Sequence, residues 1–292
     1  MNSPARILSI AGSDSSGGAG IQADIKTITM LGGYAMTAIT AVTAQDSTGV
    51  HAVEVLSPTL VAAQIDACLT DIGVDAIKIG MLGSAAIAEL VAERIAHVGV
   101  PVVFDPVMVA TSGGVLADAE TIAAFERLMA LATVVTPNTD ELAALAGIAV
   151  KNELDEGDAA EKIMKSVPCA AILAKGGHLV LEGVTKGKTA EGVIYSFANS
   201  TRVFDTLYEL RPDGWHERTW DSERIATRHT HGTGCTLSSA IATQLGKGLS
   251  LDKAIRDARE FVRMALLATP GFGAGNGPLG HAAAGVALRE DR

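Results

Sequence analysis

Short apolar runs alternate with helical patterns along the first two thirds of the chain. The runs are rich in β-branched residues and end at turns, which predicts strands over 6–12, 34–43, 76–80, 100–104, 134–135 and 170–175. Between them apolar residues recur every three or four positions, which predicts helices over 21–31, 58–69, 84–95, 119–131 and around 141–145. Strands that are apolar throughout are buried on both faces, so the alternation predicts a mostly parallel sheet with helices on both sides.

The pattern changes after Gly192. Strands are predicted over 193–197, 202–210 and 215–220, with a turn at 211–214, and we expect them to be antiparallel edge strands. Helical spacing returns over 241–249 and 251–266, and the glycine-rich stretch 270–278 predicts a loop. Because no linker or repeat divides the chain, we predict one domain over 1–292 with an extra antiparallel hairpin segment near 193–229.

A glycine-rich turn at 230–235 opens one of these helices. Gly232 and Gly234 allow positive φ and a close approach of the backbone to a ligand. The unpaired N–H groups of the helix start would bind an anion, and Cys235 would have a lowered thiol pKa there. This arrangement predicts phosphoryl transfer. The alternative is a glycine loop that leads into a core helix with a buried cysteine.

Composition narrows the class of protein. A net charge of −10 over 292 residues argues against a nucleic-acid or anionic-membrane surface, so the expected partner is a small-molecule substrate. The three cysteines are far apart, without the paired spacing of a zinc site or a disulfide framework. With neither a signal-peptide layout nor an apolar run of membrane-spanning length, we expect a soluble protein of the cytoplasm.

Polar residues recur at predicted strand ends and helix starts, where ligands bind in open parallel sheets. Taken singly, Asp24 is explained as a first-turn charge, Asn138 as a helix N-cap and Lys175 as a snorkelling side chain. Taken together on one edge, carboxylates can hold Mg²⁺ while a lysine and a helix N-terminus bind phosphate. The full set is Asp14, Asp24, Gln45, Lys78, Asp105, Asn138, Glu141, Lys175 and Cys235.

Two glycine motifs do not fit the sites that they imitate. The stretch 18–23 resembles a dinucleotide fingerprint, but several loop residues separate it from the preceding strand. The triplet Gly187-Lys188-Thr189 imitates the end of a Walker loop, but the first glycine of that motif should stand at Glu182. If the protein uses ATP, it therefore binds the nucleotide without a P-loop.

The chain carries a series of motifs by which it resembles the ribokinase-like superfamily and, within it, the hydroxymethylpyrimidine/phosphomethylpyrimidine kinases of thiamine biosynthesis. The resemblance covers nearly the whole chain. Its landmarks are Ala11-Gly12-Ser13-Asp14, the stretch 16–24, Ala44-Gln45-Asp46, Lys78-Ile79-Gly80-Met81-Leu82, Asp105-Pro106-Val107-Met108, Thr136-Pro137-Asn138 with Glu141, Lys175-Gly176-Gly177-His178 and His231-Gly232-Thr233-Gly234-Cys235-Thr236.

The resemblance implies a three-layer αβα fold, a homodimer, and ATP and Mg²⁺ as cofactors. It implies that Asp24 and Gln45 hydrogen-bond an aminopyrimidine, and that the pocket is completed by Ala19, Thr43, Met81 and Val107. It also implies Mg²⁺ near Asp105 and Glu141 and ATP contacts from Asn138, Lys175 and Thr233. The catalytic anion hole would then be formed by Gly232, Thr233, Gly234 and Cys235.

The implied activity is phosphorylation of 4-amino-5-hydroxymethyl-2-methylpyrimidine and then of its monophosphate. The related sugar kinases carry an aspartate base where Cys235 stands; a fixed aspartate would repel a monophosphate, whereas a thiol can stay neutral. The alternatives are a pyridoxal or pyridoxine kinase, a non-catalytic sensor of the pyrimidine or of pyridoxal 5′-phosphate, and, more distantly, a nucleotide-dependent oxidoreductase. The segment 199–229 looks longer than the family needs, and could cover the site or form a dimer edge.

Overall fold

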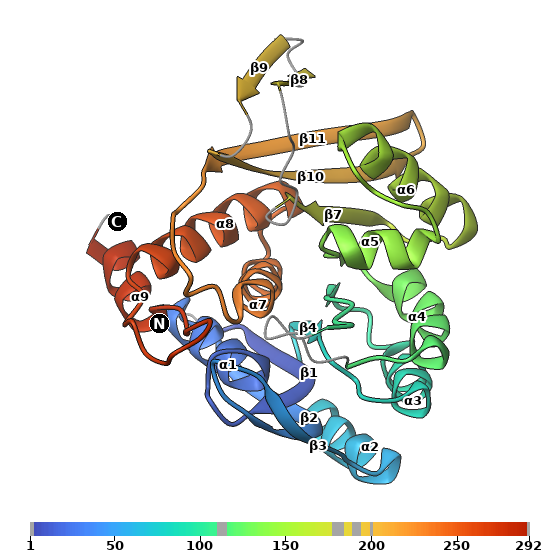
Figure 1. The fold of residues 1–292 in the computed structure, drawn as a ribbon. Helices are drawn as coiled ribbons and strands as arrows, with labels where there is room; N and C mark the ends of the chain where they lie inside the picture. Colours follow the sequence, from blue (N-terminus) through green and yellow to red (C-terminus); the bar gives the residue numbers. More distant parts are fainter. Residues whose placement is uncertain (1–2, 110–115, 177–183, 189–193, 199–200, 291–292) are drawn as a thin grey trace. The chain divides into compact units, whose positions relative to one another are not determined.

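A computed structural model describes residues 3–109, 116–176, 184–188, 194–198 and 201–290 (Figure 1). The chain divides into two compact units, one formed by Met1–Leu131 with Thr227–Arg292 and the other by Ala132–Ala226. The prediction of one domain over the whole chain stays a prediction. Several residues of the predictions above lie outside the described residues, among them Gly177 and His178 of the motif that begins at Lys175, Thr189, and Val193, where a strand was predicted to begin.

The first unit is built on five strands in the spatial order β5-β4-β1-β2-β3. Strand β1 is parallel to β2 and to β4, and β4 is parallel to β5, whereas β3 is antiparallel to β2. The central strand β1 is buried along most of its length, as its apolar run predicts. The bounds are β1 (Arg6–Asp14), β2 (Tyr34–Gln45), β3 (Val50–Val55), β4 (Ala76–Ile79) and β5 (Val102–Phe104).

Helices cover both faces of these strands (Figure 1). On one face α1 (Gly20–Met30) and α7 (Thr233–Gly246) pack on the strands, with α8 (Leu251–Leu267) and α9 (His281–Glu290) against them. The other face carries α2 (Pro58–Ala67), which continues into a π-helical turn η1 (Cys68–Ile72), then α3 (Ala85–Ile95) and α4 (Ala119–Leu131). The predicted three-layer α/β architecture with a mostly parallel sheet is confirmed.

Local sequence sets where two of these helices begin. The hydroxyl of Ser57 accepts a hydrogen bond from the N–H of Leu60 at 3.3 Å, and Pro58 follows as the first helical residue. In the same way the hydroxyl of Ser84 accepts from the N–H of Ile87 at 3.3 Å. Each cap satisfies an N–H that the helix itself cannot pair, so both predicted helix starts are confirmed.

The second unit contributes four sheet strands in the order β11-β10-β7-β6 and, separately, a two-stranded pair. Strand β6 (Val134–Val135) is parallel to β7 (Ala171–Lys175), while β10 (Arg202–Arg211) is antiparallel to both β7 and β11 (Gly214–Glu223). The helices α5 (Thr139–Ala146) and α6 (Glu153–Ser166) pack against these strands, and β8 (Val184–Lys188) pairs separately with β9 (Ile194–Ala198). The predicted antiparallel strands after Gly192 are confirmed.

Four elements were not predicted. Strand β3 is exposed along most of its length, so it lacks a buried apolar run, and β8 has Val184 as its one large apolar residue. Helices α6 and α9 carry few large apolar residues. Strand β1 runs two residues beyond its predicted end because Ser13 and Asp14 pair with Val42 and Thr43, and β2 does the same because its last two residues pair with β3. Among the described helices, none combines the length and apolarity that crossing a membrane requires.

Candidate active site

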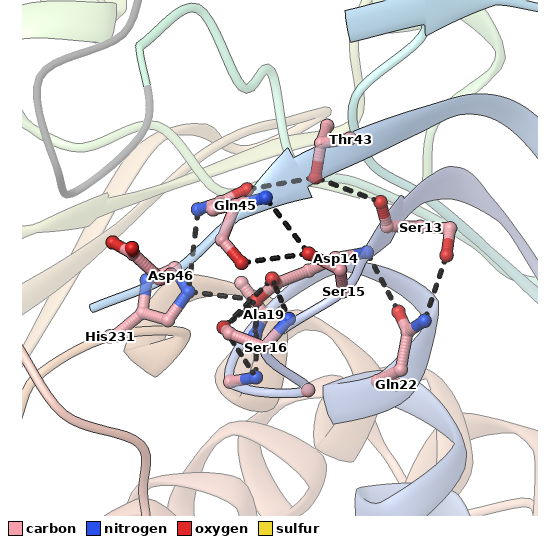
Figure 2. Close-up of polar contacts among 12 residues, drawn as sticks. Ser13, Asp14, Ser15, Ser16, Ala19, Gln22, Thr43, Gln45, Asp46 and His231 are labelled. Carbon is pink, nitrogen blue, oxygen red and sulfur yellow. Dashed lines mark hydrogen bonds and ion pairs between the residues drawn. The ribbon is translucent and has the colours of Figure 1, made fainter. Parts of the chain in front are cut away.

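The parallel strands β1 and β2 end side by side, and their last residues hold one another in place (Figure 2). The hydroxyl of Ser15 donates to the carbonyl of Gln45 at 2.7 Å and accepts from its N–H at 2.8 Å. The side chain of Gln22 accepts from the N–H of Asp14 at 2.9 Å and donates to the hydroxyl of Ser13 at 2.8 Å. The backbone beneath the Gln45 side chain is therefore fixed from both sides.

The buried carboxylate of Asp14 organises the loop that follows β1 (Figure 2). It accepts from the N–H and the hydroxyl of Ser16, both at 2.8 Å, from the N–H of Gly18 at 3.1 Å and from the N–H of Ala19 at 2.7 Å. It also lies 2.8 Å from Nε2 of His231. Burial alone would raise the pKa of Asp14, but the bonds from His231, Ala19 and Ser16 lower it to about 2.

A fully buried ion pair lies beneath this loop. Nζ of Lys78 is 2.9 Å from Oδ2 of Asp24, and the hydroxyls of Ser9 and Ser239 donate to the same carboxylate at 2.5 and 2.6 Å. Burial would lower the pKa of Lys78, yet the nearby charges of Asp24 and Asp105, and that of Cys235 once its thiol ionises, raise it above its ordinary value. Because neither side chain of the pair is exposed, Asp24 here supports Lys78; its hydrogen bond to a substrate stays a prediction.

Helix α7 begins at a glycine that no other residue could replace without strain. Gly232 has φ of +85°, and a Cβ placed on it would collide with the carbonyl oxygen of Gly18. The hydroxyl of Thr233 donates to the carbonyl of Thr230 at 2.7 Å and closes the turn. The next residues, Thr233 to Cys235, are partly exposed, so the first turn of the helix presents its amides at the surface of the unit.

The pKa of the Cys235 thiol differs from the prediction. We predicted a lowered pKa at the helix start, but the pKa of Cys235 is raised to about 11. Burial is the largest cause, and the charges of Asp24 and Asp105 act in the same direction, whereas Lys78 and a hydrogen bond from the N–H of Gly20 oppose it. The prediction of a lowered pKa was wrong because desolvation of the thiol and the two carboxylates outweigh Lys78 and the N–H of Gly20; the thiol is protonated at neutral pH.

The remaining predicted residues of the first unit follow β4 and β5. Met81 is buried, accepts a hydrogen bond from Thr40 Oγ1 at 2.6 Å, and extends its methyl group toward Gly12, where a Cβ would lie 2.5 Å from Cε. Asp105 is buried, and Ser238 Oγ lies 3.4 Å from its Oδ2. The partly exposed Val107 donates its N–H to the carbonyl of Asp105 at 2.8 Å.

The second unit brings together Asn138, Glu141 and Lys175. Asn138 is the N-cap of α5: its side chain accepts from the N–H of Glu141 at 2.9 Å, and the Glu141 carboxylate accepts from the N–H of Asn138 at 2.7 Å. Nζ of Lys175 lies 3.7 Å from Oε2 of Glu141. The N-cap explanation of Asn138 is confirmed, and the roles of the three residues toward ATP and Mg²⁺ stay predictions.

Comparison with known proteins identifies the family. Residues 14–280 match the phosphomethylpyrimidine kinase family. The chain belongs to this family. It is 42% identical over 279 residues to a hydroxymethylpyrimidine/phosphomethylpyrimidine kinase of Streptomyces coelicolor, covering 95% of this chain and 94% of the relative.

Solved structures agree with this family and with the ribokinase-like fold. A phosphomethylpyrimidine kinase from Clostridium difficile superimposes with a TM-score of 0.71 at 34% identity, covering 90% of this chain and 99% of the other. An ADP complex of Bacillus subtilis pyridoxal kinase superimposes with a TM-score of 0.81 at 35% identity, covering 99% of this chain and 100% of the other.

Sequence reasoning gave no role to several residues that this kinase family member places at its site. His231 was recognised only as part of a motif, and Asp14 only as part of another motif and as one of the strand-end candidates, whereas their pairing spans 217 positions. Ser9, which completes the ion-pair cluster together with Ser239, interrupts an otherwise apolar strand. A polar side chain inside an apolar run was the available signal, because a buried hydroxyl needs a partner.

Proposed function

We propose that this chain is an ATP-dependent kinase that phosphorylates 4-amino-5-hydroxymethyl-2-methylpyrimidine to its monophosphate and then to its diphosphate. The observation that carries the proposal is membership of the phosphomethylpyrimidine kinase family over residues 14–280, with the family's Gly232–Cys235 turn at the start of α7. The chain covers nearly the full length of the Streptomyces relative, so the proposal concerns the whole activity and not a part of it.

The residues of the first unit supply positioning and positive potential. The N–H of Thr233 donates to the carbonyl of Thr230, but the N–H groups of Gly234 and Cys235, in the first turn of α7, have no acceptor within the helix and can stabilise charge that develops on a transferred phosphoryl group. The buried, protonated Lys78 adds a cation whose field water screens little. Because the thiol of Cys235 is neutral at pH 7, it adds no negative charge that would repel the phosphate acceptor of the second transfer.

The family resemblance assigns Mg²⁺ to carboxylates of this chain. Within the described residues, no three His, Cys, Asp or Glu side chains gather as a metal site. Mg²⁺ is commonly held by one or two carboxylates together with phosphate oxygens and water. In the proposal, Asp105 and Glu141 would hold it, and Lys175, Asn138 and Thr233 would contact ATP. Bound Mg²⁺ would neutralise phosphate charge during the transfer.

A second candidate, pyridoxal kinase, is favoured by one observation. The Bacillus subtilis pyridoxal kinase superimposes over 99% of this chain with 35% identity. Pyridoxal and the hydroxymethylpyrimidine are both flat heteroaromatic alcohols, so a shared fold does not separate them. The experiment below therefore offers both acceptors.

The test is Mg²⁺-dependent ATP consumption with the hydroxymethylpyrimidine, its monophosphate and pyridoxal in parallel, with the products separated by anion exchange. Formation of the diphosphate from the pyrimidine is the expected result. A clear preference for pyridoxal would move the assignment to the second candidate. Absence of turnover with all three acceptors would favour the ligand sensor.

Cys235 distinguishes the two transfers. We expect Cys235→Asp to reduce the second transfer more than the first, because a carboxylate at this position repels a phosphate that is already anionic. The matched control is Cys235→Ser, which keeps a small neutral side chain and should reduce both transfers by similar factors. Equal losses in Cys235→Asp would contradict this explanation.

A homodimer and a cytoplasmic location are also part of the proposal. The homodimer rests on the family resemblance, and the location rests on the three widely spaced cysteines, which suit a reducing compartment. Light scattering of the purified protein tests the first, since a mass near twice 30.0 kDa is expected. Fractionation of the source cells tests the second.

A further inference from the structure

Four side chains at the ends of β1 and β2 and before α7 form one hydrogen-bonded chain (Figure 2). Oδ2 of Asp14 lies 2.8 Å from Nε2 of His231, and the same Nε2 lies 3.4 Å from the amide end of Gln45 drawn as nitrogen. The other end of that amide lies 3.2 Å from Oγ1 of Thr43, and this hydroxyl oxygen also lies 3.0 Å from the carbonyl oxygen of Ser13. The order of donors and acceptors along the chain can be worked out from these contacts.

Asp14 determines where His231 carries its proton. The Asp14 carboxylate is ionised, because four other bonds from Ser16, Gly18 and Ala19 already point at it, and an ionised carboxylate can only accept. Nε2 of His231, at 2.8 Å, must therefore be the protonated nitrogen. With its proton donated to Asp14, Nε2 has no lone pair with which to accept a second hydrogen bond.

This assignment decides which end of the Gln45 amide faces His231. An N–H of Gln45 placed beside the N–H of His231 would set two donors against each other. A carbonyl oxygen in the same place would accept a second, longer hydrogen bond from the same N–H of His231. Oxygen and nitrogen of an amide exchange places by a half-turn of the group, and the surrounding network is what assigns them.

Thr43 leads to the same assignment independently. Its single hydroxyl hydrogen has a carbonyl acceptor in Ser13, 3.0 Å away, and that carbonyl can only accept. Once the hydrogen is given to Ser13, the oxygen of Thr43 has only lone pairs for its neighbour Gln45, 3.2 Å away. The amide end that faces Thr43 must then donate, so it is the nitrogen.

We propose that His231, held by Asp14, is a positioning residue that turns the amide of Gln45 so that its oxygen faces His231 and its nitrogen faces Thr43. The amide keeps one N–H hydrogen and one oxygen lone pair for a ligand, in a single order. The consequence for selectivity rests on the proposed function, in which Gln45 contacts the substrate. An aminopyrimidine offers an amine donor beside a ring-nitrogen acceptor, and this pair matches a fixed amide in one order only. Pyridoxal has no amine beside its ring nitrogen.

The orientation itself is tested on the ligand-free protein by nuclear magnetic resonance, so this test does not depend on the activity. The side-chain NH₂ signal of Gln45 is assigned by its loss in Gln45→Glu. We expect nuclear Overhauser effects from this NH₂ to the side chain of Thr43 and imidazole ¹⁵N shifts that show His231 protonated at Nε2. Effects to the ring protons of His231 instead, or equally to both residues, would overturn the proposal.

The selectivity is tested with His231→Leu, which removes the donor, and His231→Gln, whose amide can donate again. We expect His231→Leu to raise KM for the hydroxymethylpyrimidine by about tenfold, with a smaller fall in kcat, and to leave the KM or inhibition constant of pyridoxal within about twofold. His231→Gln should recover most of the lost KM. The matched control is His216→Leu, which breaks an exposed histidine–carboxylate pair of 2.9 Å with Asp213 and should behave as the wild type.

Two further outcomes are decisive. If His231→Leu does not fold, Thr43→Val removes the acceptor of the amide nitrogen while Asp14 and His231 stay in place, and the same rise in KM is expected. If the wild type phosphorylates the pyrimidine but neither variant changes the ratio of the two substrates, the selectivity role is overturned. A wild type that does not use the pyrimidine contradicts the proposed function, and the resonance experiment still decides the orientation.

Discussion

Nζ of Lys78 lies 2.9 Å from Oδ2 of Asp24, and neither side chain reaches solvent. A buried charge that loses its partner is destabilising by about 3–5 kcal/mol, because the remaining ion stays desolvated without compensation. We therefore expect Lys78→Met to lower the free energy of unfolding by about that amount, as measured by urea denaturation. Asp24 would then remain with only the two serine hydroxyls as partners.

The double variant Lys78→Met with Asp24→Asn serves as the control for this pair. It removes both charges, so we expect it to be more stable than Lys78→Met alone. If Lys78→Met unfolds at the same urea concentration as the wild type, the pair does not carry the stability that its burial indicates.

Gly232 and Gly248 form a matched pair that separates backbone strain from a collision. Both have positive φ, +85° and +83°, but a Cβ on Gly248 would meet nothing within 4 Å, whereas on Gly232 it would meet the carbonyl of Gly18. We expect Gly248→Ala to cost about 1–2 kcal/mol of unfolding free energy through the left-handed conformation alone. Gly232→Ala should cost more and reduce turnover, because the start of α7 must move. Equal losses of stability would show that the close approach to Gly18 is unimportant.

Because of Glu156 in the second unit, we expect the free energy of unfolding to fall as pH rises. Burial is the largest cause that raises its pKa to about 7, above 4.5 for an unperturbed glutamate, although the bond from Tyr208 Oη, 3.2 Å long, opposes the shift. The folded state therefore binds more protons than the unfolded state between these two values. By linkage, Glu156 makes its full contribution to the free energy of unfolding below pH 4.5. This contribution falls by about 3 kcal/mol as pH rises through 7.

The measurement is the urea unfolding free energy of the wild type minus that of Glu156→Gln at pH 5, 6, 7 and 8. We expect this difference to fall with pH, since glutamine cannot ionise. Glu161→Gln on the same helix is the control, because the exposed Glu161 pairs with Lys165 at 2.8 Å at the surface and should give a nearly flat difference. A flat difference for Glu156→Gln as well would contradict the raised pKa.

The raised pKa of Cys235 predicts slow alkylation at neutral pH. Only the thiolate reacts, and with a pKa of about 11 it is a small fraction at pH 7. In a Cys68→Ser, Cys169→Ser background, the rate of modification by iodoacetamide should keep rising beyond pH 9. A plateau reached near pH 8 would show an ordinary or lowered pKa and would restore the prediction made from the helix start.

The sequence by itself determined the features that depend on neighbouring residues. The apolar runs and helical spacings predicted most strands and helices, and Ser57, Ser84 and Asn138 marked helix starts because a cap bonds to an N–H only two or three positions away. The exposed edge strand β3 was not predicted because it has no buried apolar run. The order of motifs identified the family for the same reason, since each motif is a short local segment.

The tertiary structure alone decided the features that depend on distant residues. The packing of α1 and α7 on the strands sets Asp24 against Lys78, 54 positions away, and His231 against Asp14, 217 positions away. The sign of the pKa shift of Cys235 also depends on how much protein surrounds the thiol, which a local helix-start argument does not contain. Burial and charge are summed over all neighbours in space, so only the folded chain specifies them.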